Sequence, residues 1–371
     1  MWEEALELKK KDNFEHGGNL KEIQDKFSLS RDEIIDFSAN INFLGIPDLV
    51  KKAVEKEIEN LIHYPQPQAE DFKNELSKNL NIKKEKIIAG NGAAELIYLL
   101  LDYLKIDKIL LPVPSFSEYE KAVYKIEAEL DFFYLNEEDN FSLNLSELKN
   151  SLKGKDLIIL NNPHNPTGKL YKKDKLKEIL KIAKKEGTFV LVDEAFIDFK
   201  ENENSYSLIN EVKHFDNLFI LRSLTKFFAI PGLRLGYGMG NSRLIAELEK
   251  RRDPWTVNSL AQIAGVKAVN DKNYIKKSKI KNKKERGFLY RSLKDISDLK
   301  VYEPSVNFIL LKIKKDLSAG KLREKMASQE IIIRDCSNFC GLDNRYFRVA
   351  VKSREENLKL LRVLKNSLKK V

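Results

Sequence analysis

Short apolar segments alternate with longer helical segments along most of this chain, and this alternation limits the possible folds more than any other feature. The apolar segments cover residues 86–90, 108–114, 156–163, 189–196, 218–226 and 234–240, and most of them are bounded by Gly, Pro or Asn. Unbroken apolar strands separated by helices are typical of a mainly parallel sheet that helices cover on both faces. The sequence therefore predicts an α/β fold that binds its ligands at the carboxyl ends of the strands.

The carboxyl-terminal part of the chain has a different pattern. A lysine-rich helical segment begins near residue 261, and further strands are predicted at residues 306–313, 330–336 and 346–352 before a final helix. Strands with helices on one side indicate a smaller α+β domain. We predict a large domain over residues 41–262 and a small domain that combines residues 1–40 with residues 263–371.

The composition excludes several classes of protein. The net charge is +10, but the lysines are dispersed among glutamates as on solvated helix faces, so we expect no nucleic-acid partner. The chain has no run of about 20 apolar residues, so we expect no membrane partner. Two cysteines, Cys336 and Cys340, are too few for a disulfide framework or a zinc site. These features predict a cytoplasmic enzyme without a metal.

The segment 223–238, SLTKFFAIPGLRLGYG, carries the first candidate chemistry. Lys226 follows an apolar strand, where burial can lower its pKa and make its amine a nucleophile toward an aldehyde. Ser223, Thr225 and Arg234 could converge on a phosphate group. Taken alone, the segment is equally compatible with a buried lysine in a salt bridge.

Three further strand ends strengthen the case. Asp193 follows an apolar strand and could pair with a protonated pyridine nitrogen. Asn165 lies between two prolines in a rigid turn and could hydrogen-bond a ring hydroxyl. The turn AGNGAAE (89–95) opens a helix whose free N–H groups suit a phosphate. Each feature alone could be an ordinary turn or cap, but all of them together favour one cofactor site.

These motifs resemble those of the fold-type I pyridoxal-phosphate enzymes of the aminotransferase class I and II family. The resemblance implies that Lys226 holds the cofactor covalently, that Asp193 pairs with its ring nitrogen and that Asn165 binds its O3′. It also implies residues for the cofactor phosphate, which are Ser223, Thr225 and Arg234 with the backbone of Gly92 and Ala93. Phe116 would stack on the ring, and Tyr64 would reach the phosphate in a neighbouring subunit, which predicts a homodimer.

Other stretches resemble the threonine-phosphate decarboxylase branch of this family. They are HGGNL (16–20), DFSANINFLG (36–45), PWTVN (254–258) and residues 331–351. The chain departs from the branch at Phe43 and Cys340, where the branch has proline. The resemblance implies that Arg348 binds the substrate carboxylate and that Asn40 adds a polar contact near it. Arg334, His16 and Gly17 would bind a substrate phosphate, although a surface salt bridge for Arg334 and a simple turn for His16 are alternatives.

The implied reaction is the decarboxylation of O-phospho-L-threonine or O-phospho-L-serine to an aminoalkyl phosphate for the cobalamin nucleotide loop. Phe196 favours this branch, because many aminotransferases have a tyrosine there. The same residues could run transamination, so a histidinol-phosphate or related aminotransferase is the alternative. A regulatory or nucleic-acid-binding protein that retains the fold is a third, weaker hypothesis.

Overall fold

The computed structural model describes residues 17–27, 29–30 and 32–369. Its centre is a seven-stranded sheet with the order β2-β8-β7-β6-β5-β3-β4. The strands are β2 (Ile87–Asn91), β3 (Lys108–Val113), β4 (Glu129–Tyr134), β5 (Leu157–Asn161), β6 (Phe189–Asp193), β7 (Leu218–Ser223) and β8 (Leu235–Met239). Only β8 runs antiparallel to its neighbours in this sheet. The predicted mainly parallel sheet is confirmed.

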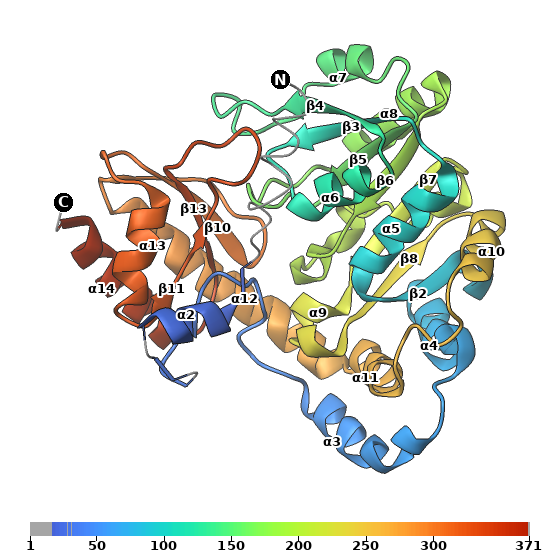
Figure 1. Cartoon of the computed structure of the whole chain (residues 1–371), viewed down its shortest axis with the longest axis horizontal. Coiled ribbons are helices and arrows are strands. Elements are labelled where there is room, and N and C mark those ends of the chain that lie inside the picture. Colours follow the sequence, from blue (N-terminus) through green and yellow to red (C-terminus); the bar gives the residue numbers. More distant parts are fainter. Residues whose placement is uncertain (1–16, 28, 31, 370–371) are drawn as a thin grey trace.

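Helices bury both faces of this sheet (Figure 1). In β5, Ile158 and Leu160 belong to one apolar cluster, and Leu157 and Ile159 belong to another. Successive side chains of a strand point to opposite faces, so a strand with apolar residues at every position needs cover on both sides. The helices around the sheet are α3 (Asp48–Glu57), α4 (Glu70–Leu80), α5 (Gly92–Leu104), α6 (Ser117–Lys125), α7 (Leu145–Ser151), α8 (Lys173–Glu186), α9 (Leu224–Phe227), α10 (Ser242–Arg251) and α11 (Ser259–Asn270).

A second, antiparallel sheet has the order β12-β13-β10-β9. Its strands are β9 (Leu299–Val301), β10 (Phe308–Ile313), β12 (Arg334–Asp335) and β13 (Tyr346–Ala350). A separate apolar cluster joins it to the helices α12 (Lys272–Lys294), α13 (Ala319–Ala327) and α14 (Arg354–Lys369). The amino-terminal elements α2 (Leu20–Phe27) and β1 (Ile35–Asp36) lie beside it in Figure 1, and β1 pairs with β11 (Ile331–Ile332).

The two sheets fit the predicted large α/β and small α+β parts, while the boundaries at residues 41 and 262 stay a prediction. The segment 330–336, expected as one strand, is divided into β11 and β12, which pair with different strands. Short 3-10 helices complete the chain: η1 (Ile58–Ile62), η2 (Pro67–Ala69), η3 (Lys84–Lys86), η4 (Ile197–Phe199), η5 (Glu203–Ser205), η6 (Ile209–Lys213) and η7 (Pro231–Leu233). No helix within the described ranges is both long and apolar enough to cross a membrane.

Candidate active site

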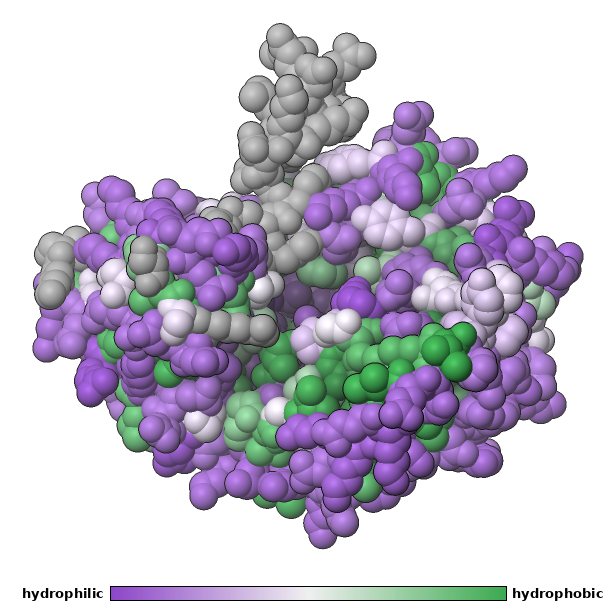
Figure 2. All heavy atoms as spheres, turned by 60° about the horizontal axis from the view of Figure 1, so that its bottom comes forward, coloured by the Kyte–Doolittle hydropathy of each residue, from purple (hydrophilic) through white to green (hydrophobic). Residues whose placement is uncertain are grey.

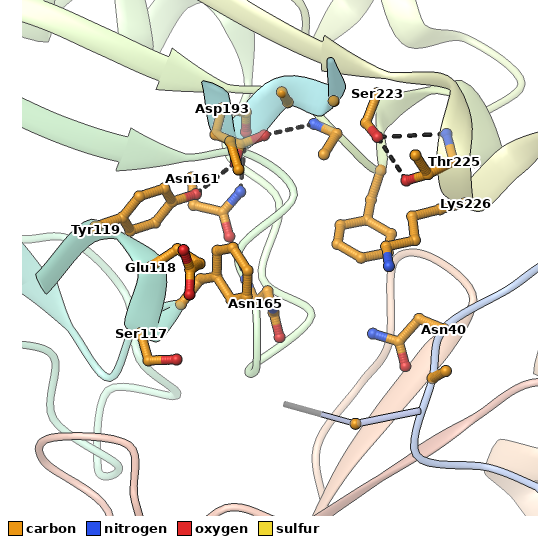
Figure 3. A pocket seen from close by; sticks show the side chains of 18 of the residues that line it. Asn40, Ser117, Glu118, Tyr119, Asn161, Asn165, Asp193, Ser223, Thr225 and Lys226 are labelled. Carbon is orange, nitrogen blue, oxygen red and sulfur yellow. Dashed lines mark hydrogen bonds between the residues drawn. The ribbon is translucent and has the colours of Figure 1, made fainter. Parts of the chain in front are cut away.

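A cavity of about 430 Å³ opens at the edge of the large sheet where β5, β6 and β7 end, and residues from the small sheet close it. Most of the predicted site residues line it: Lys226, Asp193, Asn165, Gly92, Ala93, Phe116, Ser223, Thr225, Arg234, Gly17, Asn40, Arg334 and Arg348. Figure 3 shows side chains from both parts of the chain pointing into this hollow. Residues far apart in sequence are therefore brought together as the sequence predicted.

Lys226 lies in the short helix α9, directly after β7, and projects into the cavity (Figure 3). Burial, with further effects from the cations Arg348 and Arg234, lowers the pKa of Lys226 to about 8. A lysine with this pKa is partly neutral near pH 7 and can act as a nucleophile. The backbone N–H of Asn42 donates to the carbonyl oxygen of Lys226 at 3.0 Å, and the side chain of Asn42 donates to Phe227 O at 2.8 Å. Sequence reasoning did not find this support, which comes from the DFSANIN segment.

An anion-binding corner lies where α5 begins. A Cβ atom added to Gly92 would lie 2.6 Å from Nη2 of Arg234, so a larger residue here would displace the guanidinium, and the φ of +79° also favours glycine. Arg234 precedes β8, and the antiparallel direction of β8 places Arg234 at the edge where the parallel strands end. Ser223 and Thr225 share a hydroxyl–hydroxyl hydrogen bond of 2.7 Å. Backbone N–H groups at a helix start, a guanidinium and two hydroxyls together suit a phosphate.

Asp193 is buried at the end of β6 and holds two hydrogen-bond donors (Figure 3). Its Oδ2 accepts a hydrogen bond of 2.6 Å from the hydroxyl of Tyr119, and its Oδ1 accepts one of 2.8 Å from the N–H of Ala195. The amide of Asn161 bridges the same strand ends, because it donates to Asp193 O at 2.9 Å and accepts from Asn165 N at 2.8 Å. Sequence reasoning missed Tyr119 and Asn161. Tyr119 lies one helical turn after Phe116, but this spacing does not show which group the Tyr119 hydroxyl contacts.

Two buried arginines, Arg334 and Arg348, face each other across the pair β12–β13. Arg348 donates to Ser38 O at 2.9 Å and to the side-chain oxygen of Asn165. Burial, together with the charge of Arg334, lowers the pKa of Arg348 to about 10. Like charges directly opposite on neighbouring strands destabilise a sheet. Their position on the cavity wall therefore indicates a receptor for anions.

The remaining polar residues at this end of the cavity also suit a ligand. Oδ1 of Asn40 and Nε of Arg348 are buried and have no hydrogen-bond partner among the residues that the structure describes. Gly17 packs so closely on Ser38 that an added Cβ would lie 2.4 Å from Ser38 O. The prediction for His16 falls outside the described residues.

Tyr64 lies away from the cavity of its own chain. Its side chain is 81% exposed, and its ring packs against Trp255 with 4.9 Å between the ring centroids. The role of Tyr64 in a neighbouring subunit stays a prediction.

The cavity residues fit pyridoxal phosphate. A lysine with a lowered pKa, a buried carboxylate and an anion-binding corner match the aldehyde, the ring nitrogen and the phosphate of this cofactor.

Comparison with known proteins supports this interpretation. The family description "Aminotransferase class I and II" matches residues 32–364. The chain is 40% identical to a protein of Caldanaerobacter subterraneus subsp. tengcongensis named "Putative threonine-phosphate decarboxylase", over 95% of this chain and 93% of that protein. It is 35% identical to threonine-phosphate decarboxylase of Salmonella typhimurium, over 96% and 97% of the two chains. A solved histidinol-phosphate aminotransferase from Clostridium acetobutylicum is 36% identical, with a TM-score of 0.85 over 90% of this chain and 99% of that one.

Proposed function

We propose that this chain, which belongs to the aminotransferase class I and II family, decarboxylates O-phospho-L-threonine or O-phospho-L-serine to an aminoalkyl phosphate. Family membership confirms the fold-type I architecture and pyridoxal phosphate as the cofactor. The observation that carries the substrate proposal is the opposed pair Arg334 and Arg348 on the cavity wall. A phosphorylated amino acid has two anionic groups for these two cations. The product would serve as the linker of the cobalamin nucleotide loop.

We assign the cofactor contacts to residues of the large sheet. Lys226 would hold the cofactor covalently, Asp193 would pair with its ring nitrogen, and Asn165 would bind O3′. Its phosphate would contact Ser223, Thr225, Arg234 and the backbone of Gly92 and Ala93, with Phe116 against its ring. When bound, pyridoxal phosphate supplies an electron sink for the electron pair left at the substrate Cα.

We assign substrate binding to the small sheet and the amino-terminal segment. Arg348 would bind the carboxylate, with Asn40 beside it. Arg334, Gly17 and His16 would bind the phosphate. Two fixed anchors would hold the substrate in one orientation and so would select which bond at Cα is broken. Lys226, in its protonated form, would deliver the proton that replaces the lost carboxylate at Cα.

A product assay tests the reaction directly. The protein is incubated with pyridoxal phosphate and O-phospho-L-threonine, without a keto-acid acceptor, and the products are measured by mass spectrometry. Catalytic formation of aminopropanol phosphate supports the proposal. Parallel reactions with O-phospho-L-serine compare the two substrates, which differ by one methyl group and about 1–3 kcal/mol of discrimination.

A histidinol-phosphate or related aminotransferase is the second candidate. It is favoured by the 36% identity to the Clostridium acetobutylicum enzyme over nearly its whole length. This activity requires an amino acceptor, so the same assay is repeated with histidinol phosphate and 2-oxoglutarate. Turnover only in that second reaction would replace the decarboxylase with the aminotransferase.

We further propose that the chain acts as a cytoplasmic homodimer with shared active sites. The segment around α3 and η1 exposes large apolar side chains, and Trp255, which packs on Tyr64, joins them: Ile46, Leu49, Ile58, Leu61, Ile62 and Tyr64. Figure 2 turns this lower side of Figure 1 forward and shows hydrophobic residues gathered on it. Clustered apolar exposure favours burial against a partner.

Light scattering tests the dimer. Ile62→Asp should produce monomers, because Ile62 is 84% exposed within the proposed contact. Ile280→Asp is the matched control, since Ile280 is 52% exposed on α12. If light scattering gives the native protein the mass of one chain, the proposal of shared active sites is wrong.

A further inference from the structure

Tyr119 makes the shortest polar contact to the carboxylate of Asp193. The tyrosine lies in the first turn of α6 and the aspartate at the end of β6, and the two are 74 residues apart. The hydroxyl oxygen and Oδ2 are separated by 2.6 Å. This distance is typical of a hydrogen bond from a hydroxyl to an ionised carboxylate. Because Tyr119 is fully buried, water does not compete for this contact.

The surroundings of Asp193 explain what the hydroxyl does. Burial raises the pKa of Asp193, whereas hydrogen bonds from Tyr119 and the Ala195 N–H lower it. Burial also raises the pKa of Tyr119 well above its usual value, so its hydroxyl keeps its proton and remains a donor. Without the phenol, Oδ2 would lose a short hydrogen bond while the carboxylate stays largely buried at the cavity wall. The buried carboxylate would then take up a proton more readily.

The ring of Tyr119 has a second contact that bears on the site. It packs edge-on against Phe116, with 5.6 Å between the centroids and 87° between the planes. Phe116 lines the cavity. One buried tyrosine therefore touches both the carboxylate and the aromatic side chain assigned to the cofactor.

We propose that Tyr119 is a positioning residue that keeps Asp193 ionised and oriented for pyridoxal phosphate, and so sets how tightly the cofactor is held. The inference rests on the proposed cofactor role of Asp193 and is independent of which substrate is used. An ionised Asp193 offers the ring nitrogen a charged partner, whereas a protonated one does not.

The test compares cofactor affinity in Tyr119→Phe and a matched control. Tyr119→Phe removes the hydroxyl and retains the ring contact with Phe116. Tyr171→Phe is the control, because Tyr171 is also buried but donates to a backbone oxygen, Phe141 O, at 3.0 Å. The apo protein is titrated with pyridoxal phosphate, and the dissociation constant and the visible absorption spectrum are recorded.

We expect Tyr119→Phe to raise the dissociation constant roughly ten- to hundredfold, as for loss of a hydrogen bond to a charged group. Its visible spectrum should also change, while Tyr171→Phe should stay within about threefold of the native affinity. In an Asp193→Asn background, Tyr119→Phe should have little further effect, because the charge it serves is gone. Equal affinity losses in both tyrosine variants, or none in Tyr119→Phe, would overturn the proposal. If Asp193→Asn alone leaves affinity unchanged, the proposed role of Asp193 fails instead.

Discussion

We expect the buried ion pair between Glu194 and Arg222 to stabilise the ends of two neighbouring strands, and a single substitution tests this. Glu194 follows Asp193, and Arg222 precedes Ser223, so the pair joins the ends of β6 and β7 that carry site residues. Their side chains are 0% and 1% exposed, with 2.9 Å between Oε2 and Nη2. Glu194 also accepts hydrogen bonds from the Ser207 hydroxyl at 2.7 Å and the Leu208 N–H at 2.8 Å. Glu194→Gln retains the shape of this side chain and removes its charge.

The expected loss of folding stability depends on the partners that Arg222 retains. Removing one member of a buried pair costs about 3–5 kcal/mol when the other charge is left alone. Arg222 would still have Asp198 at 3.0 Å and Glu203 at 3.9 Å, both partly exposed. We therefore expect the lower end, a decrease of about 3 kcal/mol in the free energy of unfolding. At roughly 2 °C per kcal/mol for a large chain, the Tm should fall by about 6 °C.

Thermal and urea unfolding of the apo protein measure this change. Glu247→Gln is the control, because its pair with Lys250 is a surface contact whose side chains are 35% and 70% exposed. Such a pair contributes at most about 1 kcal/mol. If Glu194→Gln is no more destabilising than Glu247→Gln, the buried pair does not hold the strand ends together.

Three further predictions concern the cavity. Gly92→Ala should raise the cofactor dissociation constant at least about tenfold, because its Cβ would meet Arg234. Gly154→Ala is the control for backbone strain, because Gly154 has a similar positive φ of 68° and nothing lies within 4 Å of its added Cβ. An equal effect of Gly154→Ala on cofactor affinity would contradict the clash with Arg234. Arg334→Gln should raise the KM for O-phospho-L-threonine about a hundredfold and leave cofactor affinity within about threefold of the native value. A loss of cofactor affinity instead would refute the assignment of Arg334 to the substrate. Lys226 has its pKa lowered to about 8, so its neutral, nucleophilic form increases as the pH rises through that value. The rate of cofactor uptake by the apo protein should therefore rise with a midpoint near pH 8, and a midpoint near the free-lysine value of about 10.4 would contradict the burial effect.

The strands and the residues at their ends were predictable from the sequence. A strand buried on both faces leaves an uninterrupted apolar run, and the polar residue that ends it, such as Asp193 or Ser223, is conspicuous. The strand β4 was not among the predicted apolar runs. It lies at the sheet edge and its side chains are mostly half-buried or exposed, so charged residues interrupt its pattern. Edge strands carry a weaker signal for this reason.

Contacts between side chains of distant segments were not predictable from the pattern. Tyr119 reads as one apolar position of the helix α6, and nothing in its neighbourhood shows that its hydroxyl meets Asp193. Asn42 likewise depends on the packing of an amino-terminal segment against α9. The opposition of Arg334 and Arg348 depends on the register of β12 and β13. Periodicity predicts which element a residue belongs to, but register and packing decide what it faces.

The two sheets carry different parts of the proposed site, and this arrangement relates the fold to the substrate. The large sheet carries the groups assigned to the cofactor, which any member of the family needs for its chemistry. The small sheet carries Arg334 and Arg348, two like charges that are buried directly opposite each other on the cavity wall. Two buried cations therefore favour a substrate with two anionic groups, and a phosphorylated amino acid meets this requirement with its carboxylate and its phosphate.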